Sequence, residues 1–159
     1  MTDAEGAAAP PGSQRRSEPL SGTLTFQLMT LGAVAADRFA AALAPLDLKP
    51  RHAALMAVVG RGLAASQLEV AAHLGVVPSL VVALADHLVR LGAVERIRDP
   101  RDRRRQVLLL TQHGHRLLER CAAAARSVDE ELAARLPASE RAAFTRSLGA
   151  LANGAGFPT

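Results

Sequence analysis

Two short helical segments separated by a three-residue turn limit the possible folds of this chain more than any other feature. "SQLE" at residues 66–69 has the spacing of a capping box, in which Ser66 and Glu69 each accept a hydrogen bond from the other's backbone amide. The helix that it opens ends at Gly75, and Pro78 occupies the first turn of a second helix, which Gly92 ends. Two helices with so short a connection predict a helix-turn-helix.

Hydrophobic spacing gives each helix a buried side and indicates that the apolar segment "GVVPSLVVALADHL" forms a helix over residues 78–91 rather than a strand. Its outward side carries few polar groups, because Ser79 is the only polar side chain between Gly75 and Ala85. The side chains expected to point inward are Leu68, Ala71 and Leu74 in the first helix and Val81, Leu84, Leu88 and Leu91 in the second.

A charged hairpin follows over residues 94–110, where two β-prone runs flank an Asp-Pro-Arg-Asp turn. Between His87 and Arg120 the chain has nine arginines and four acidic residues, a net charge of +5 that exceeds the +4 of the whole chain. A run of charge usually only solvates a surface. An arginine-rich hairpin directly after a helix-turn-helix is instead typical of winged domains, whose cations meet DNA phosphates or enter the minor groove. The hairpin arginines expected to make these contacts are Arg98, Arg101, Arg103, Arg104 and Arg105.

Longer helices flank this lobe, so the expected fold class is mainly α with a small β-hairpin wing. An apolar face repeats at helical spacing from Leu24 to Leu46, and another helix is expected from Pro50 to Gly60. Thr111 is expected to cap a long helix that Pro137 ends, and Ser139 to cap a last one. Their expected inward residues include Leu117, Cys121 and Val128 in the long helix and Phe144, Leu148 and Leu151 in the last.

Composition excludes several other classes of protein. Of the 159 residues 49% are hydrophobic, but four Phe with no Trp or Tyr leave an aliphatic core, and abundant Ala and Leu favour helices over sheets. We find no secretory signal and no apolar stretch long enough to span a bilayer, so we predict a soluble, cytoplasmic protein without a membrane partner. A single cysteine excludes an internal disulfide and suits a reducing compartment.

Residue patterns for catalysis or metal binding are also missing from the sequence. We find no nucleophile with a base, no paired carboxylates and no phosphate-binding loop, so we predict that the chain is not an enzyme and needs no cofactor. His113 and His115 are two residues apart and do not share a helical face, so no metal site is predicted. Cys121 lies on the apolar line of its helix, which favours a buried structural cysteine over a redox sensor.

From about Leu24 to Leu151 the chain resembles the MarR family of transcription regulators. "DPRDRRRQVLLLTQHGHRLL" is similar to the family's wing and its "LT-x-x-G" helix start, while "SQLEVAAHLGV" and "DHLVRLGAVERIRD" are similar to its helix-turn-helix. The resemblance implies an obligate homodimer that binds a near-palindromic operator in double-stranded DNA and responds to a small molecule. We expect this homodimer to act as a repressor. The expected organisation is a disordered tail over 1–20, a helical dimerisation region from 21–48 and 111–154, and a winged DNA-binding lobe over 49–110.

The resemblance also implies roles for individual residues. Arg104 would enter the minor groove at the wing tip, with Asp102 paired to it, and Asp86 would brace the wing or the backbone. The remaining implied DNA contacts are Arg101, Arg103 and Arg105 on phosphates, and His87 and Arg90 on the outward side of the second helix.

The start of helix 78–91 departs from the family, whose members commonly have hydroxyl and basic side chains there. The corresponding positions of this chain hold Val77, Leu80, Val82 and Ala83. None of these donates a hydrogen bond to a base edge, so Ser79 and His87 remain as polar base readers.

Three explanations for these apolar residues stay open. In the first, Leu80, Val82 and Ala83 contact thymine methyl groups, and DNA shape and the wing add specificity. In the second, the protein binds DNA weakly or not at all and turns this face to a partner. In the third, the helix is partly buried. We favour the first explanation, because the arginine wing would otherwise have little purpose.

Family members often bind small, frequently aromatic anions between the dimerisation helices and the DNA-binding lobe. By this resemblance Arg51 and His52 could meet an effector carboxylate, with Met29 and Met56 as apolar walls. An equally good interpretation is that Arg51 is solvated and His52 packs locally. The alternative to a DNA-binding regulator is a dimeric interaction or ligand-binding module, derived from a winged helix, whose DNA binding is weak or lost.

Overall fold

The computed structural model of the chain describes residues 19–62, 66–99, 102 and 104–154. Most of the tail expected over 1–20 lies outside these residues, as do Arg101 and Arg103 of the wing. The described chain is mainly helical with one two-stranded antiparallel sheet, which confirms the predicted fold class. Contacts divide the chain into two units, residues 1–33 and 34–159, and the division into tail, dimerisation region and winged lobe stays a prediction.

The first unit contains a short 3-10 helix, Leu20–Gly22, and the beginning of helix α1, Leu24–Leu43. Its large apolar side chains are exposed, including Leu24, Phe26 and Leu31. The stretch Leu24–Leu46 is long and apolar enough to cross a membrane by length and composition alone, so the expectation that the chain has no such stretch is wrong. The cause is that Asp37 and Arg38 are its only charged residues.

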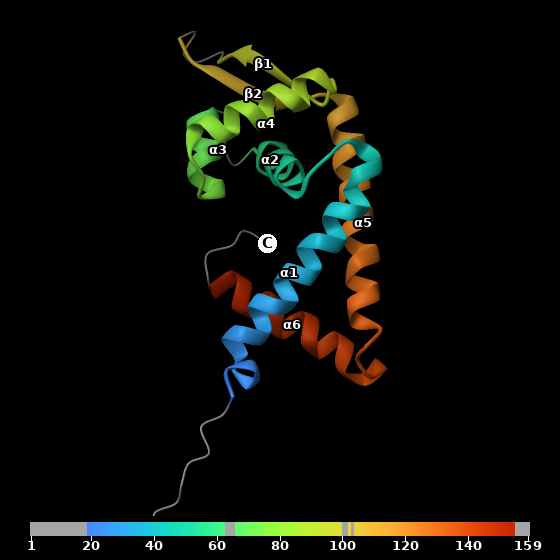
Figure 1. Cartoon of the computed structure of the whole chain (residues 1–159). Coiled ribbons are helices and arrows are strands. Elements are labelled where there is room, and N and C mark those ends of the chain that lie inside the picture. The colour runs from blue at the N-terminus through green and yellow to red at the C-terminus, as the bar shows by residue number, and fades with distance from the viewer. Residues whose placement is uncertain (1–18, 63–65, 100–101, 103, 155–159) are drawn as a thin grey trace, which may run out of the picture. The chain divides into compact units, whose positions relative to one another are not determined.

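The second unit is built around a helix-turn-helix and its hairpin (Figure 1). After a 3-10 turn, Ala44–Leu46, come α2 (Pro50–Gly60), α3 (Gln67–Leu74) and α4 (Pro78–Arg90). Strands β1 (Val94–Arg98) and β2 (Gln106–Leu110) pair with Val94 opposite Leu110 and Arg98 opposite Gln106. Helices α2 and α3 pack against α4, and β1 lies along α4. The largest fully buried side chains, which form the centre of this aliphatic core, are Leu43, Leu55, Met56, Leu88, Leu108, Val70, Val81 and Val94.

Local sequence signals account for the ends of these elements. Ser66 and Glu69 form the predicted capping box, with the two side chains accepting from each other's amides at 3.2 and 2.9 Å. Gly75 and Gly92 end their helices with φ of 62° and 67°, a left-handed conformation that glycine adopts without strain. Thr111 caps the next helix by accepting from the Gly114 amide at 3.0 Å, as predicted.

The buried side of α3 differs from the prediction. Leu68 is 68% exposed, while Val70 and Ala71 are buried and Leu74 is partly buried. The predicted residues Leu68, Ala71 and Leu74 are three apart, which is less than one helical turn. After two such steps Leu68 and Leu74 lie on different sides of the helix. In a helix of only eight residues, Val70 and Ala71 therefore define the buried side.

Two long helices complete the second unit, α5 (Gln112–Ala133) and α6 (Ala138–Gly154). Leu117, Cys121 and Val128 of α5 are buried as predicted. Helix α6 corrects two expectations: it begins before Ser139, which is therefore not its cap, and Phe144, Leu148 and Leu151 are exposed rather than inward. The buried core of the described residues includes no side chain of α6, so this apolar face stays partly open to solvent in a single chain.

Candidate nucleic-acid interface

Helix α4 has one fully buried side and one open side. Val81, Leu84 and Leu88 are buried, while Ser79, Val82, Ala83 and Arg90 are exposed. Leu80 is partly buried against the core, so it is less open to DNA than its position in the sequence implied. The explanation that the helix is partly buried therefore applies to Leu80 and not to Val82 or Ala83.

His87 does not point outward as expected, because it packs against helix α2. Its ring stacks on His52 with 4.4 Å between ring centroids and 7° between planes. Its Nε2 lies 2.7 Å from the carbonyl oxygen of Asp47, which can only accept, so Nε2 carries the proton. Arg90 Nη2 lies 3.4 Å from Nδ1 of the same ring. His87 is thus engaged within the chain, and Ser79 is the one exposed hydroxyl left near the start of α4.

His52 itself caps the start of α2. Its Nδ1 accepts from the Lys49 amide at 3.0 Å, in the position where a capping box usually has Glu or Gln. Burial, together with the nearby His87 and Lys49, lowers the pKa of His52 to about 4. The ring is therefore neutral at physiological pH. Its local packing agrees with the second of the two interpretations given for His52, rather than with a contact to an effector carboxylate.

Two ion pairs tie the hairpin to the helix-turn-helix. The first joins Asp86 of α4 to Arg96 of β1, whose Nη2 and Oδ1 lie 2.6 Å apart. This ion pair is the kind of contact expected of a residue that braces the wing, and that role of Asp86 stays a prediction. Arg96 was missed from the sequence, although a cation on the strand after the helix was the signal that could have suggested it.

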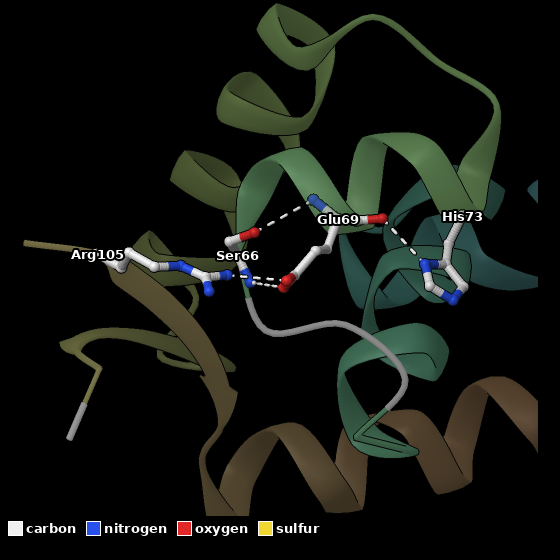
Figure 2. A network of polar contacts seen from close by, with 4 residues as sticks. All are labelled: Ser66, Glu69, His73 and Arg105. Carbon is white, nitrogen blue, oxygen red and sulfur yellow. Dashed lines mark hydrogen bonds and ion pairs between the residues drawn. The ribbon is translucent and has the colours of Figure 1, made fainter. Parts of the chain in front are cut away.

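The second ion pair joins the hairpin to the start of α3 (Figure 2). Arg105 Nη2 lies 2.8 Å from Glu69 Oε1, while the other carboxylate oxygen accepts from the Ser66 amide. The hydrogen bond and charge of Glu69 raise the pKa of Arg105, so this cation stays charged. In the chain alone the Arg105 side chain pairs with Glu69, and its expected contact with phosphates stays a prediction. No local spacing signals this pair, because its members lie in different elements.

The tip of the wing is shaped by hydrogen bonds among backbone groups and one carboxylate. Asp102 Oδ1 accepts from the backbone amide of Arg104 at 3.0 Å, and the Asp102 carbonyl accepts from the Arg105 amide at 2.9 Å. Asp102 thus supports the tip through the backbone of Arg104 rather than through its guanidinium. Arg104 and Arg98 are exposed, and the expected contacts of Arg101 and Arg103 lie outside the described residues.

A groove of about 1090 Å³ lies between the end of α1, the start of α2 and α4. Its lining includes Arg51 and His52 but neither of the expected methionine walls. Met56 is instead fully buried in the core. Lys49 and Arg90 add positive charge at its edge, and Leu80 and Leu84 add apolar surface.

Comparison with solved structures relates this architecture to known regulators. A MarR family transcriptional regulator from Rhodococcus sp. RHA1 is 27% identical, with a TM-score of 0.72 over 86% of this chain and 96% of that one. CouR from Rhodococcus jostii RHA1, solved with p-coumaroyl-CoA, is 28% identical, with a TM-score of 0.70 over 90% and 98%. A Mycobacterium tuberculosis MarR family protein, solved in complex with DNA, is 29% identical, with a TM-score of 0.71 over 81% and 97%.

The family model described as "MarR family" matches residues 46–105, which span the helix-turn-helix and most of the hairpin. The chain belongs to the MarR family. It is therefore a DNA-binding transcription regulator with a winged helix-turn-helix, and family membership confirms the prediction that it is not an enzyme. No curated protein sequence matches the chain significantly.

The cysteine of this MarR regulator is buried within α5. Cys121 is 2% exposed, and burial raises the pKa of its thiol, which disfavours the reactive thiolate. This is the environment predicted for a structural cysteine. Within the described residues, no three His, Cys, Asp or Glu side chains are grouped to hold a metal ion.

Proposed function

We propose that this MarR regulator is a cytoplasmic homodimer that represses transcription from a near-palindromic operator and is released by a small effector. The observation that carries the proposal is the open face of α4 beside a wing that two ion pairs fix in place. Each subunit would insert α4 into a major groove and the wing tip, with Arg104, into the neighbouring minor groove. CouR, a transcriptional repressor solved on a 23-mer DNA duplex, supports this function.

The exposed apolar faces of α1 and α6 support a dimer. Phe26, Leu28 and Leu31 in the first unit, and Phe144 and Leu148 in the second, are large apolar side chains open to solvent in a single chain. Soluble monomers rarely expose such surface in continuous patches, and a second copy would cover it. The same role accounts for the apolar length of α1 without a membrane. A symmetric dimer would set its two α4 helices about 34 Å apart, one turn of DNA.

The groove beside α4 supports an effector that is both anionic and apolar. Lys49, Arg51 and Arg90 supply positive charge, while Leu80 and Pro50 supply apolar contacts. Two structural relatives were solved with p-coumaroyl-CoA and p-aminosalicylic acid, each of which combines an aromatic ring with acidic groups. Because residues of α4 line the groove, an occupant there would change the position or availability of the DNA-reading helix.

A mobility-shift assay with the intergenic DNA beside the gene tests the proposal. Wild-type protein should bind in a salt-dependent manner, and Arg104→Ala should weaken binding about ten-fold or more and lower the salt dependence. Arg126→Ala is the matched control, because Arg126 is an exposed arginine of α5 away from the wing, and it should bind normally. Unchanged affinity in Arg104→Ala would remove the wing tip from the mechanism.

The second candidate function is a dimeric interaction or ligand-binding module that has lost DNA binding. The exposed Val77 and Val82 on α4 favour it, because apolar surface also suits a protein partner. Absence of any specific shift at low salt would support this module over the repressor.

A further inference from the structure

The N-cap residue and the first two turns of α4 present methyl groups to the solvent, at positions where a reading helix would present hydrogen-bond donors. Val77 and Val82 are 64% and 40% exposed, and Ala83 is also exposed. Ser79 supplies the one hydroxyl on this stretch. We infer that this methyl face, defined as Val77, Val82 and Ala83, reads the 5-methyl groups of thymines in the major groove. This inference rests on the proposed DNA-binding function.

The other polar side chains of α4 have partners within the chain, so they do not add hydrogen bonds to bases beside the methyl face. Asp86 is paired with Arg96, and His87 donates to the Asp47 carbonyl. Arg90, at the far end of the helix, lies beside the His87 ring. Base reading at the start of α4 must therefore come from apolar contact and the Ser79 hydroxyl.

Base chemistry determines which pairs such a face accepts. The thymine methyl is the apolar group on the major-groove edge, whereas guanine offers two acceptors and cytosine a donor. A valine placed against guanine or cytosine would remove water from these polar groups without replacing its hydrogen bonds, which weakens binding. The methyl face should therefore select A·T pairs, with the thymine methyl toward α4, at its contact positions in each half-site.

The wing keeps the methyl face turned to the groove. The ion pairs of Asp86 with Arg96 and of Glu69 with Arg105 join the hairpin to α4 and α3, so the position of the hairpin is tied to that of these helices. When Arg104 enters the minor groove, the orientation of α4 in the adjacent major groove is largely determined. Valines at its start then lie against base edges rather than in solvent.

The experiment begins with selection of binding sites by the full-length protein from random-sequence duplexes long enough for two half-sites. Enriched duplexes are then synthesised with deoxyuridine in place of thymidine at the half-site positions, which removes only the 5-methyl group. We expect affinity to fall about four-fold for each contacted methyl, the equivalent of one buried methyl group. Deoxyuridine placed outside the half-sites is the DNA control and should leave the affinity unchanged.

A protein variant separates direct methyl contact from an effect of deoxyuridine on DNA shape. Val82→Ala should bind thymine and uracil duplexes with nearly equal affinity at one position of each half-site, because the contacting methyls are gone. Val89→Ala is the matched control, since Val89 is 37% exposed on the same helix but lies two turns further from its reading end. It should discriminate like the wild type.

Each outcome decides one point. Equal binding of thymine and uracil half-sites, or enrichment of G·C pairs at these positions, would overturn thymine reading and leave the DNA-binding function standing. Discrimination that persists unchanged in Val82→Ala would overturn the assignment of methyl reading to this face. Failure to enrich any duplex would overturn both the inference and the proposed function.

Discussion

Replacement of Gly114 by alanine should destabilise the junction between the wing and α5. Gly114 lies in the first turn of α5, where its amide donates to the Thr111 hydroxyl. A Cβ at this position would clash with the carbonyl oxygen of Ala93 and lie 2.9 Å from its carbonyl carbon. Because these are backbone atoms just before β1, they cannot rotate away as the end of a flexible side chain would.

The size of the effect follows from the contacts that must give way. Separating α5 from Ala93 would strain two hydrogen bonds of Thr111, from its amide to Ala93 at 3.1 Å and from its hydroxyl to Gly92 at 2.6 Å. Each such bond contributes about 1 kcal/mol, and overpacking costs about 1–3 kcal/mol more. Alanine is favoured over glycine in a helix by about 1 kcal/mol, which offsets part of this loss. The net loss of folding free energy should be about 2–4 kcal/mol.

Thermal unfolding at one fixed protein concentration measures this loss, and the midpoint should fall by roughly 5–10 °C. Gly149→Ala is the matched control, because a Cβ there meets nothing within 4 Å in the interior of α6. That variant should be as stable as the wild type or slightly more stable. If Gly114→Ala and Gly149→Ala have the same unfolding midpoint, the close approach of α5 to Ala93 does not constrain the junction.

Three further predictions concern the helix starts and the wing. Val77→Ser should stabilise the protein by about 1 kcal/mol, seen as a higher unfolding midpoint, because Val77 gives α4 no side-chain cap; no change would mean that the first-turn amides are satisfied otherwise. A double-mutant cycle of Glu69→Gln and Arg105→Ala in urea unfolding should show favourable coupling, since the pair joins α3 to the hairpin, and additive effects would remove this brace. The folded-state pKa of His52 is about 4 against 6.5 for the free side chain, so the unfolded chain takes up the proton first. Stability should fall by up to about 3 kcal/mol as the pH drops from 6.5 to 4, and His52→Gln should flatten this pH dependence.

The elements of the winged lobe follow from local chemistry and were predictable. The capping box of Ser66 and Glu69, the left-handed Gly75 and Gly92, and the Thr111 cap each depend on residues only a few positions apart. Such signals act before any tertiary contact forms. The brace role of Asp86 came from resemblance to the family, and its partner Arg96 became visible only in the structure.

Side-chain roles that depend on distant partners were not predictable in the same way. Leu68 was expected to be buried because it lies three residues before Ala71. Spacing along the chain does not say where the core lies, and the core contacts Val70 instead. Phe144 and Leu148 form an apolar face that stays partly exposed in one chain, so helical spacing alone did not give their environment. Periodicity identifies an apolar face but does not say what covers it.

The same limit explains why the set of α4 side chains expected to contact bases changed. His87 was expected to read bases because the family resemblance placed it on the outward side of its helix, but His52 and Asp47, from the region of α2, hold its ring. Each polar side chain that a distant partner engages leaves one fewer donor for DNA. The methyl groups of Val77 and Val82 consequently carry more of the specificity than the sequence suggested. A thymine-to-uracil substitution is therefore a sharper test of this regulator than any change in its charged residues, because charge affects binding to all DNA sequences alike.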